Sequence, residues 1–289
     1  MGESTTDTTE YSLSYGGNQV ADNAYLRLLK GCLTGYLYPE SSYLQLYPTP
    51  GFGLWTWVRR IVLQAFEGRG FRVFKVMPFE PSLRENGADW PSICYSMIGL
   101  KRMDNLQGCI ETVLRDGVPG DFIETGVWRG GACILMRAVL KVHNVDDRDV
   151  WLADSFRGLP PPSLEIDRGY DLSGHRYMAV GMEAVRDSFR RFDLLDEHVK
   201  FLQGWFKDTL PSSPIKRLAV LRLDGDLYES TMDVLTSLYD RLSPGGFAIV
   251  DDYHTWPNCR RAVDEFRAQR GISDPIQEID GSAVFWRRG

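Results

Sequence analysis

The stretch DFIETGVWRGG, residues 121–131, decides the fold class of this chain. Its first five residues have the pattern of a short buried strand, and the glycines that follow predict a sharp turn into a helix over 132–142. Glycine lets the backbone approach a ligand closely, and free amides at the start of a helix attract anionic groups. A strand, a glycine-rich turn and a helix in this order predict a ligand-binding turn in an α/β sheet.

Short apolar runs alternate with helical patterns along the rest of the chain after residue 121. Strands are expected over residues 121–125, 150–153, 199–203, 218–223 and 247–250. Helices are expected over residues 132–142, 182–192, 230–242 and 260–270. This alternation predicts a mostly parallel, doubly wound sheet with helices on both faces.

The C-terminal end of the chain departs from this alternation. Residues 276–279 and 283–286 flank Asp280-Gly281, a dipeptide suited to a tight hairpin turn. A doubly wound sheet that closes with an antiparallel hairpin is the arrangement of class I methyltransferases. The fold class expected is therefore α/β, with a Rossmann-like catalytic domain at 121–289.

Residues 21–120 are expected to form a mainly helical lid and acceptor-binding region. Leucines at positions 26, 29 and 33 have helical spacing, and the runs 55–65 and 97–114 are also helical in pattern. Residues 76–92 contain several prolines and are expected to be a loop. The polar, acidic residues 1–20 are expected to be a flexible leader.

Composition restricts the class of protein further. The 289 residues include 33 basic and 39 acidic side chains, a net charge of −6, which argues against a nucleic-acid partner. No apolar run has the length of a bilayer span, so no membrane partner is expected. Five scattered cysteines without paired spacing indicate free thiols in the reducing cytoplasm.

The ends of the first three predicted strands carry residues suited to a cofactor. The spacing after the first strand is G-x3-G-G rather than the dinucleotide fingerprint, and Glu124 precedes it. An acid there would repel phosphate but would suit the ammonium group of S-adenosylmethionine. Asp154, 30 residues later, ends the second strand where an acid can accept the ribose hydroxyls, and Ser155 follows it.

The third strand ends in Gln203-Gly204-Trp205-Phe206, which offers an amide and aromatic faces to an adenine ring. Other interpretations stay open for these strand ends. The glycines could serve packing alone, Asp154 could be a helix N-cap, and the aromatic residues could belong to the core.

The most specific signal is a set of acids at the ends of the last two parallel strands. Asp224 ends one buried strand, and Asp251 and Asp252 end the next. Adjacent parallel strands bring their carboxyl ends to the same edge of the sheet, where ligands bind. Three carboxylates repel one another unless a cation neutralises them, and their hard oxygens suit Mg²⁺. His254 follows closely and is a candidate auxiliary acid–base group.

Several of these stretches together resemble the TylF/macrocin O-methyltransferase family. The resemblance is carried by MIGLKRMDNL (97–106), GDFIETGVWRGG (120–131), DSFRGLPPP (154–162), LDGDLYEST (223–231) and DDYH (251–254). It covers roughly residues 21–45 and 93–289. The family implies methylation of sugar hydroxyls on glycosylated natural products, dependent on S-adenosylmethionine and Mg²⁺.

The resemblance also implies roles for individual residues. Asp224 would be metal ligand and general base, with Asp251 and Asp252 completing the metal site, and Ser96 and Met97 would close over the cofactor. The full set expected at the cofactor is Ser96, Met97, Glu124, Thr125, Gly126, Arg129, Gly130, Asp154, Ser155, Gln203, Gly204, Trp205, Phe206 and Asp224. Mg²⁺ bound to neighbouring acceptor oxygens would make a hydroxyl easier to deprotonate.

The acceptor and the assembly are less closely defined. Residues 46–92 depart from the family pattern and carry Trp55, Trp57 and Trp90, which leaves the identity of the acceptor open. A catechol-like phenol is an alternative to a sugar, because both offer two adjacent oxygens to Mg²⁺. A nicotinamide-dependent reductase and a non-catalytic partner-binding protein are alternatives of other classes. The missing dinucleotide fingerprint opposes the former, and the retained acids oppose the latter. The aromatic first part suggests a homodimer or a larger homo-oligomer.

Overall fold

A seven-stranded sheet forms the centre of the molecule in the computed structural model, which describes residues 16–38, 43–48, 53–89 and 92–289. Its strand order is β5-β4-β3-β6-β7-β9-β8. The strands are β3 (Asp121–Thr125), β4 (Val150–Asp154), β5 (Val199–Gln203), β6 (Leu218–Leu223), β7 (Leu242–Val250), β8 (Gln277–Glu278) and β9 (Val284–Arg287). The first five are parallel, and β9 is antiparallel to both β7 and β8. The predicted doubly wound sheet with a terminal hairpin is confirmed.

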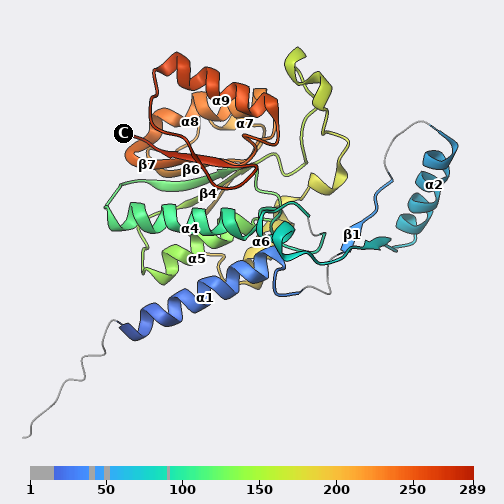
Figure 1. The fold of residues 1–289 in the computed structure, drawn as a ribbon, viewed down its shortest axis with the longest axis horizontal. Helices are drawn as coiled ribbons and strands as arrows, with labels where there is room; N and C mark the ends of the chain where they lie inside the picture. The colour runs from blue at the N-terminus through green and yellow to red at the C-terminus, as the bar shows by residue number, and fades with distance from the viewer. Residues whose placement is uncertain (1–15, 39–42, 49–52, 90–91) are drawn as a thin grey trace, which may run out of the picture.

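Helices cover both faces of the sheet (Figure 1). On one face lie α4 (Leu100–Arg115), α5 (Gly131–Val142) and α6 (Met182–Arg191), with α1 (Gly16–Thr34) packed against α4 and α5. On the other face lie α7 (Phe206–Thr209), α8 (Tyr228–Leu238) and α9 (Pro257–Arg270). Each face has its own buried hydrophobic cluster, so β3, β4, β6 and β7 are largely removed from water, whereas the edge strands β5 and β8 are partly or fully exposed.

The N-terminal part contains the three predicted helices and some structure that was not predicted. The helices are α1, α2 (Leu54–Gly68) and α4, and the leucines at 26, 29 and 33 are buried. Strands β1 (Tyr43–Gln45) and β2 (Phe74–Val76) pair antiparallel outside the main sheet. Helix α2 stands away from the sheet and its helices (Figure 1).

The prediction of a loop over 76–92 was wrong at its centre. A short helix, α3 (Pro81–Glu85), forms there with Pro81 in its first turn. Proline fits this position because its fixed φ suits a helix start and its missing N–H has no partner there in any case. Similarly, the helix predicted over 230–242 ends in a 3₁₀ turn, η4 (Tyr239–Arg241), and Leu242 already belongs to β7.

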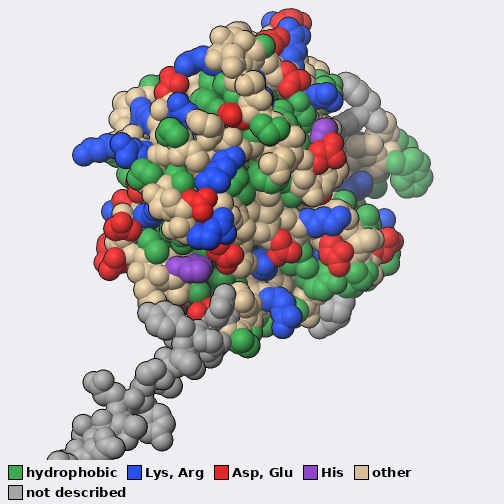
Figure 2. Space-filling view, turned by 60° about the vertical axis from the view of Figure 1, so that its left-hand side comes forward, with side chains coloured by type: hydrophobic (Ala, Val, Ile, Leu, Met, Phe, Trp, Pro, Cys, Tyr) green, Lys and Arg blue, Asp and Glu red, His purple; other side chains and the backbone are tan. Residues whose placement is uncertain are grey.

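Two expectations fall wholly or partly outside the described residues. The leader was expected over 1–20, of which residues 1–15 are not described, and α1 begins at Gly16. Trp90 also lies outside them. Across the described ranges, no helix combines the length and the apolar character needed to cross a bilayer. On the face seen in Figure 2, acidic and basic side chains are interspersed.

Candidate active site

A cavity opens at the carboxyl edge of the parallel strands. Eight of the residues predicted to form the site line it: Met97, Gly126, Asp154, Ser155, Gly204, Trp205, Phe206 and Asp224. They come from the ends of β3, β4, β5 and β6 and from the segment before α4. Ligands bind at this edge in open α/β sheets. The structure therefore brings together most, but not all, of the residues expected around a cofactor.

The glycine turn after β3 allows neighbouring backbones to approach closely. Gly126 has a φ of +94°, and a Cβ there would lie 1.8 Å from the carbonyl oxygen of Asp224. At Gly131 a Cβ would lie 2.6 Å from both the carbonyl oxygen of Tyr95 and the Cβ of Ser96. The glycines thus serve packing, and this packing places Asp224 and the segment 95–97 beside the turn.

Asp154 is held at the end of β4 by backbone amides. Its Oδ2 accepts a hydrogen bond from the Val127 amide at 2.8 Å, and its Oδ1 accepts one from the Phe156 amide at 2.7 Å. Burial raises the pKa of this carboxyl, and the amide bonds oppose that shift. The Ser155 hydroxyl also donates to Oδ1, at 3.4 Å, so Oδ2 is the oxygen better able to accept a further hydrogen bond from a ligand in the cavity.

Glu124 does not line the cavity. Its side chain is buried between β6 and α5. Its Oε1 accepts a hydrogen bond from Nη1 of Arg222 on β6, at 2.5 Å, and its Oε2 accepts one from Cys133 on α5, at 2.9 Å. Burial raises the pKa of Glu124 to about 7, although Arg222 lowers it. Thr125 is also fully buried, and its hydroxyl donates to the Arg222 carbonyl at 3.3 Å.

Four further residues predicted at the cofactor lie outside the cavity lining: Ser96, Arg129, Gly130 and Gln203. Arg129 donates to the Cys94 carbonyl at 2.7 Å, and its guanidinium lies 4.2 Å from the ring centre of Trp128. Gly130 is the left-handed N-cap of α5. Ser96 is buried, whereas Gln203 is exposed.

His254 is likewise outside the cavity lining. Its Nε2 lies 3.6 Å from a carboxylate oxygen of Glu278 on β8. Its ring stands edge-on to that of Tyr253, at 5.0 Å between centroids. The structure thus directs this histidine toward the terminal hairpin.

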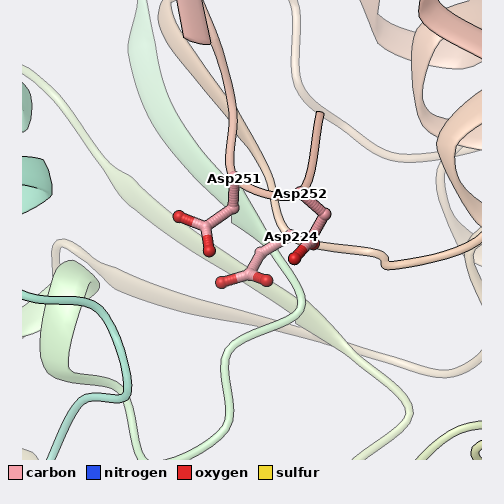
Figure 3. A group of neighbouring side chains, drawn as sticks. All are labelled: Asp224, Asp251 and Asp252. Atoms are coloured by element: carbon pink, nitrogen blue, oxygen red, sulfur yellow. The ribbon is translucent and has the colours of Figure 1, made fainter. Parts of the chain in front are cut away.

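Asp224, Asp251 and Asp252 form a compact cluster at the ends of β6 and β7 (Figure 3). One carboxylate oxygen from each lies within 4.8 Å of the others. Asp251 and Asp252 are buried, while 27% of the Asp224 side chain stays exposed toward the cavity. The sequence prediction of three converging acids is therefore matched by their placement.

Two buried arginines meet this cluster and were not predicted. Arg222, on β6, donates from Nη1 to Asp224 at 2.8 Å and from Nη2 to Asp251. Arg102, on α4, donates to Asp251 at 2.6 Å. Within the described part of the chain, no arginine lies at ion-pair distance from the Asp252 carboxylate, whose one hydrogen bond comes from the Asp226 amide, at 3.3 Å.

The electrostatics of the cluster reflect burial and mutual repulsion. Burial and then Asp251 raise the pKa of Asp224 to about 6, while Arg222 opposes the shift. Burial, followed by repulsion from Asp226 and Asp224, raises the pKa of Asp252 well above its usual value. The cluster thus holds more carboxyl groups than its two arginines can pair, so a proton or a cation is needed to relieve their repulsion.

The cavity also contains residues that were missed. Trp128 and Asp226 line it, and both have positive φ angles, 46° and 60°. The Asp226 carboxylate accepts a bond from Trp256 Nε1 at 3.0 Å, and the Trp128 indole donates to the Tyr177 carbonyl at 2.9 Å. Trp128 lies in the stretch 120–131 and Asp226 in the stretch 223–231, both of which the sequence analysis assigned to the site. Their positions in these turns could therefore have identified them as cavity residues. Met178 also lines the cavity, and its surrounding sequence carries no comparable signal.

The fold and the site are those of a class I methyltransferase that uses S-adenosylmethionine. The features that define this class here are the strand order, the turn after β3, the acid that ends β4 and the cavity at this edge of the sheet. The chain belongs to the macrocin O-methyltransferase (TylF) family, which it matches over residues 22–288. It is accordingly an O-methyltransferase. The family resemblance of the sequence is confirmed, and the reductase and non-catalytic alternatives are wrong.

Individual relatives agree with this family. The chain is 60% identical to 8-demethyl-8-(2,3-dimethoxy-alpha-L-rhamnosyl)-tetracenomycin-C 4'-O-methyltransferase of Streptomyces olivaceus, over 70% of this chain and 78% of the relative. It is 54% identical to mycinamicin III 3''-O-methyltransferase of Micromonospora griseorubida, over 73% and 85%. The solved structure of the O-methyltransferase NovP matches with a TM-score of 0.79 at 45% identity, covering 92% of this chain and 99% of that one.

Proposed function

We propose that this protein transfers the methyl group of S-adenosylmethionine to a sugar hydroxyl of a glycosylated natural product, with Mg²⁺ as a cofactor. The observation that carries the proposal is the convergence of Asp224, Asp251 and Asp252 beside the cavity. The names of the relatives support the acceptor class, since one methylates a rhamnosyl tetracenomycin and another methylates mycinamicin III.

The donor set of the cluster fits Mg²⁺. All three ligands are carboxylates, and hard oxygen donors in an open site suit this ion. Each aspartate retains lone pairs beyond those bonded to arginine or amide groups. When bound there, Mg²⁺ would lower the pKa of an acceptor hydroxyl.

The remaining steps are assigned to the chain's own side chains. Asp224 faces the cavity and takes the proton of the hydroxyl, because its Oδ2 is bonded to Arg222 while Oδ1 has no such bond. Asp154 binds the ribose of the cofactor, and Trp205 and Phe206 flank its adenine. We assign no acid–base role to His254, because its side chain is directed toward Glu278.

An acceptor comparison tests this function. The protein, S-adenosylmethionine and Mg²⁺ are incubated separately with a rhamnosylated aromatic polyketide, the same polyketide without its sugar, and a catechol. Mass spectrometry with fragmentation is expected to locate one new methyl group on the sugar of the first compound alone. Methylation of the catechol or of the sugar-free polyketide, with the glycoside unchanged, would instead establish the phenol alternative.

We further propose a homo-oligomeric cytoplasmic protein. The five free cysteines support the reducing compartment. Helix α2 makes an ion pair with the rest of the chain, in which a carboxylate oxygen of Glu67 lies 3.5 Å from Nη1 of Arg176. Other side chains of α2 are apolar and exposed. These are Leu54, Trp55, Trp57, Ile61, Val62 and Phe66. At about 150–250 Å² for a whole aromatic side chain, they expose on the order of 700 Å², close to the roughly 800 Å² per partner of a standard interface.

A further inference from the structure

Arg102 contacts one of the proposed metal ligands, Asp251, at the carboxylate oxygen that Arg222 does not bond. Its Nη1 donates to Oδ2 of Asp251 at 2.6 Å, and its Nε donates to Oδ2 of Asp280 at 2.7 Å. Its Nη2 donates to the Asn86 carbonyl at 3.1 Å. Arg222 bonds Oδ1 of Asp251. Both oxygens of Asp251 are therefore bonded to guanidinium groups, one from a helix and one from the sheet.

These bonds supply countercharge to a buried carboxylate. An ionised carboxylate removed from water is costly unless it is paired and hydrogen-bonded. Asp251 is buried, and the two guanidinium groups meet that requirement without any cation. The two arginines also hold the carboxylate in one orientation, so a ligand position exists before an ion arrives.

The same charge opposes a cation. An ion bound to Asp251 would lie within a few ångströms of the Arg102 guanidinium, and like charges at that separation repel strongly in a partly buried site. The geometry itself leaves room for coordination, because a carboxylate oxygen that accepts one hydrogen bond retains a second lone pair. Arg102 therefore makes ion binding less favourable in energy without blocking the ion from the free lone pairs of Asp251.

We propose that Arg102 is a positioning residue that supplies the countercharge of Asp251 when no ion is bound and thereby weakens the binding of Mg²⁺. The inference rests on the proposed Mg²⁺ site at Asp224, Asp251 and Asp252. Its consequence would be a Mg²⁺ ion that the protein alone holds loosely at Asp224, Asp251 and Asp252.

The test combines two measurements on the full-length protein: calorimetric titration with Mg²⁺ after removal of metal, and thermal unfolding in EDTA. Arg102→Gln is expected to unfold at a lower temperature in EDTA, because Asp251 loses countercharge, yet to bind Mg²⁺ roughly tenfold more tightly. Arg102→Lys keeps the charge and is expected to bind Mg²⁺ within a few-fold of the wild type. If Arg102→Gln does not fold, Arg102→Met, which retains an apolar stem, carries the same expectation.

Asp280→Asn is the matched control. It weakens the other ion pair of Arg102 but leaves the guanidinium at Asp251, so it should lower the unfolding temperature without tightening Mg²⁺ binding. Unchanged or weaker binding of Mg²⁺ by Arg102→Gln overturns the inference and leaves Arg102 a purely structural ion pair. A wild-type protein that binds no Mg²⁺ overturns the proposed metal site itself, which separates the two failures.

Discussion

At the scale of single residues, the acids at the strand ends could be predicted and their partners could not. Parallel strands end at one edge, so Asp224 and Asp251 had to be neighbours. Glu124 was assigned to the cofactor because it precedes a glycine turn, but it lies in register with Arg222 on β6. Arg222 is a charged residue inside the apolar run LAVLRL, and such a residue needs a buried partner of opposite charge. This pattern could have predicted that Arg222 pairs with an acid on a neighbouring strand.

Replacing Asp224 by Asn tests the residue assigned as general base. Turnover is expected to fall by roughly 10²–10⁴-fold, because the amide cannot accept the hydroxyl proton and is a poorer metal ligand. Calorimetry should find the affinity for S-adenosylhomocysteine unchanged. Loss of cofactor binding with the catalytic rate otherwise preserved would contradict the role given to Asp224.

Gly126→Ala tests the close approach of β3 and β6. The new Cβ would meet the Asp224 carbonyl oxygen at 1.8 Å from a backbone with a φ of +94°, so the free energy of unfolding should fall by about 1–3 kcal/mol. Gly108→Ala is the control, because Gly108 lies within α4 and nothing surrounds its Cβ position within 4 Å. Denaturant unfolding should find that variant equal to or more stable than the wild type, and equal losses at both positions would refute the argument.

At the scale of elements, the central parallel strands could be predicted because strands buried on both faces are short, nearly continuous apolar runs. The partly exposed edge strand β5 (VKFLQ) was predicted from its apolar residues and its place in the strand–helix alternation. Strands β1 and β2 were missed because each has three residues and neither is buried, so no pattern distinguishes them. Helix α3 was missed because Pro81 was interpreted as a loop residue, although proline also suits the first turn of a helix.

The packing of α1 on α4 and α5 gives a prediction at this scale. Leu33 is completely buried, so Leu33→Ala should lower the free energy of unfolding by about 2–5 kcal/mol. Leu28 lies on the same helix and is 57% exposed, so Leu28→Ala should change it by less than about 0.5 kcal/mol. Chemical denaturation measures both, and similar small effects would mean that α1 does not belong to the core.

At the scale of the whole molecule, the sheet and the N-terminal part differ in how completely their apolar surface is covered. Both faces of the sheet are packed, whereas Trp55 on α2 is 83% exposed. The sequence could suggest an aromatic N-terminal part, but it could not show where α2 lies, because the contact between Glu67 and Arg176 joins residues that are remote in sequence.

Substitution of the apolar face of α2 tests the proposed assembly. Light scattering during size-exclusion chromatography should find a homo-oligomer for the wild type and a smaller species for Trp55→Ser combined with Ile61→Ser, because the interface loses apolar area. Leu164→Ser replaces a side chain about as exposed as that of Ile61, 40% against 42%, outside α2 and should leave the mass unchanged. A wild-type protein that is monomeric at micromolar concentration would refute this surface as an interface.

The central claim is that methyl transfer to a sugar requires a metal ion at the three aspartates. The most direct measurement is turnover of a rhamnosylated polyketide by EDTA-treated protein while Mg²⁺ is titrated back, with Asp252→Asn alongside. The wild type should be inactive in EDTA and recover as Mg²⁺ is added, and the variant should need far more Mg²⁺ because it lacks one ligand. Full turnover in EDTA, or recovery by the variant at the same Mg²⁺ concentration, would contradict the metal site.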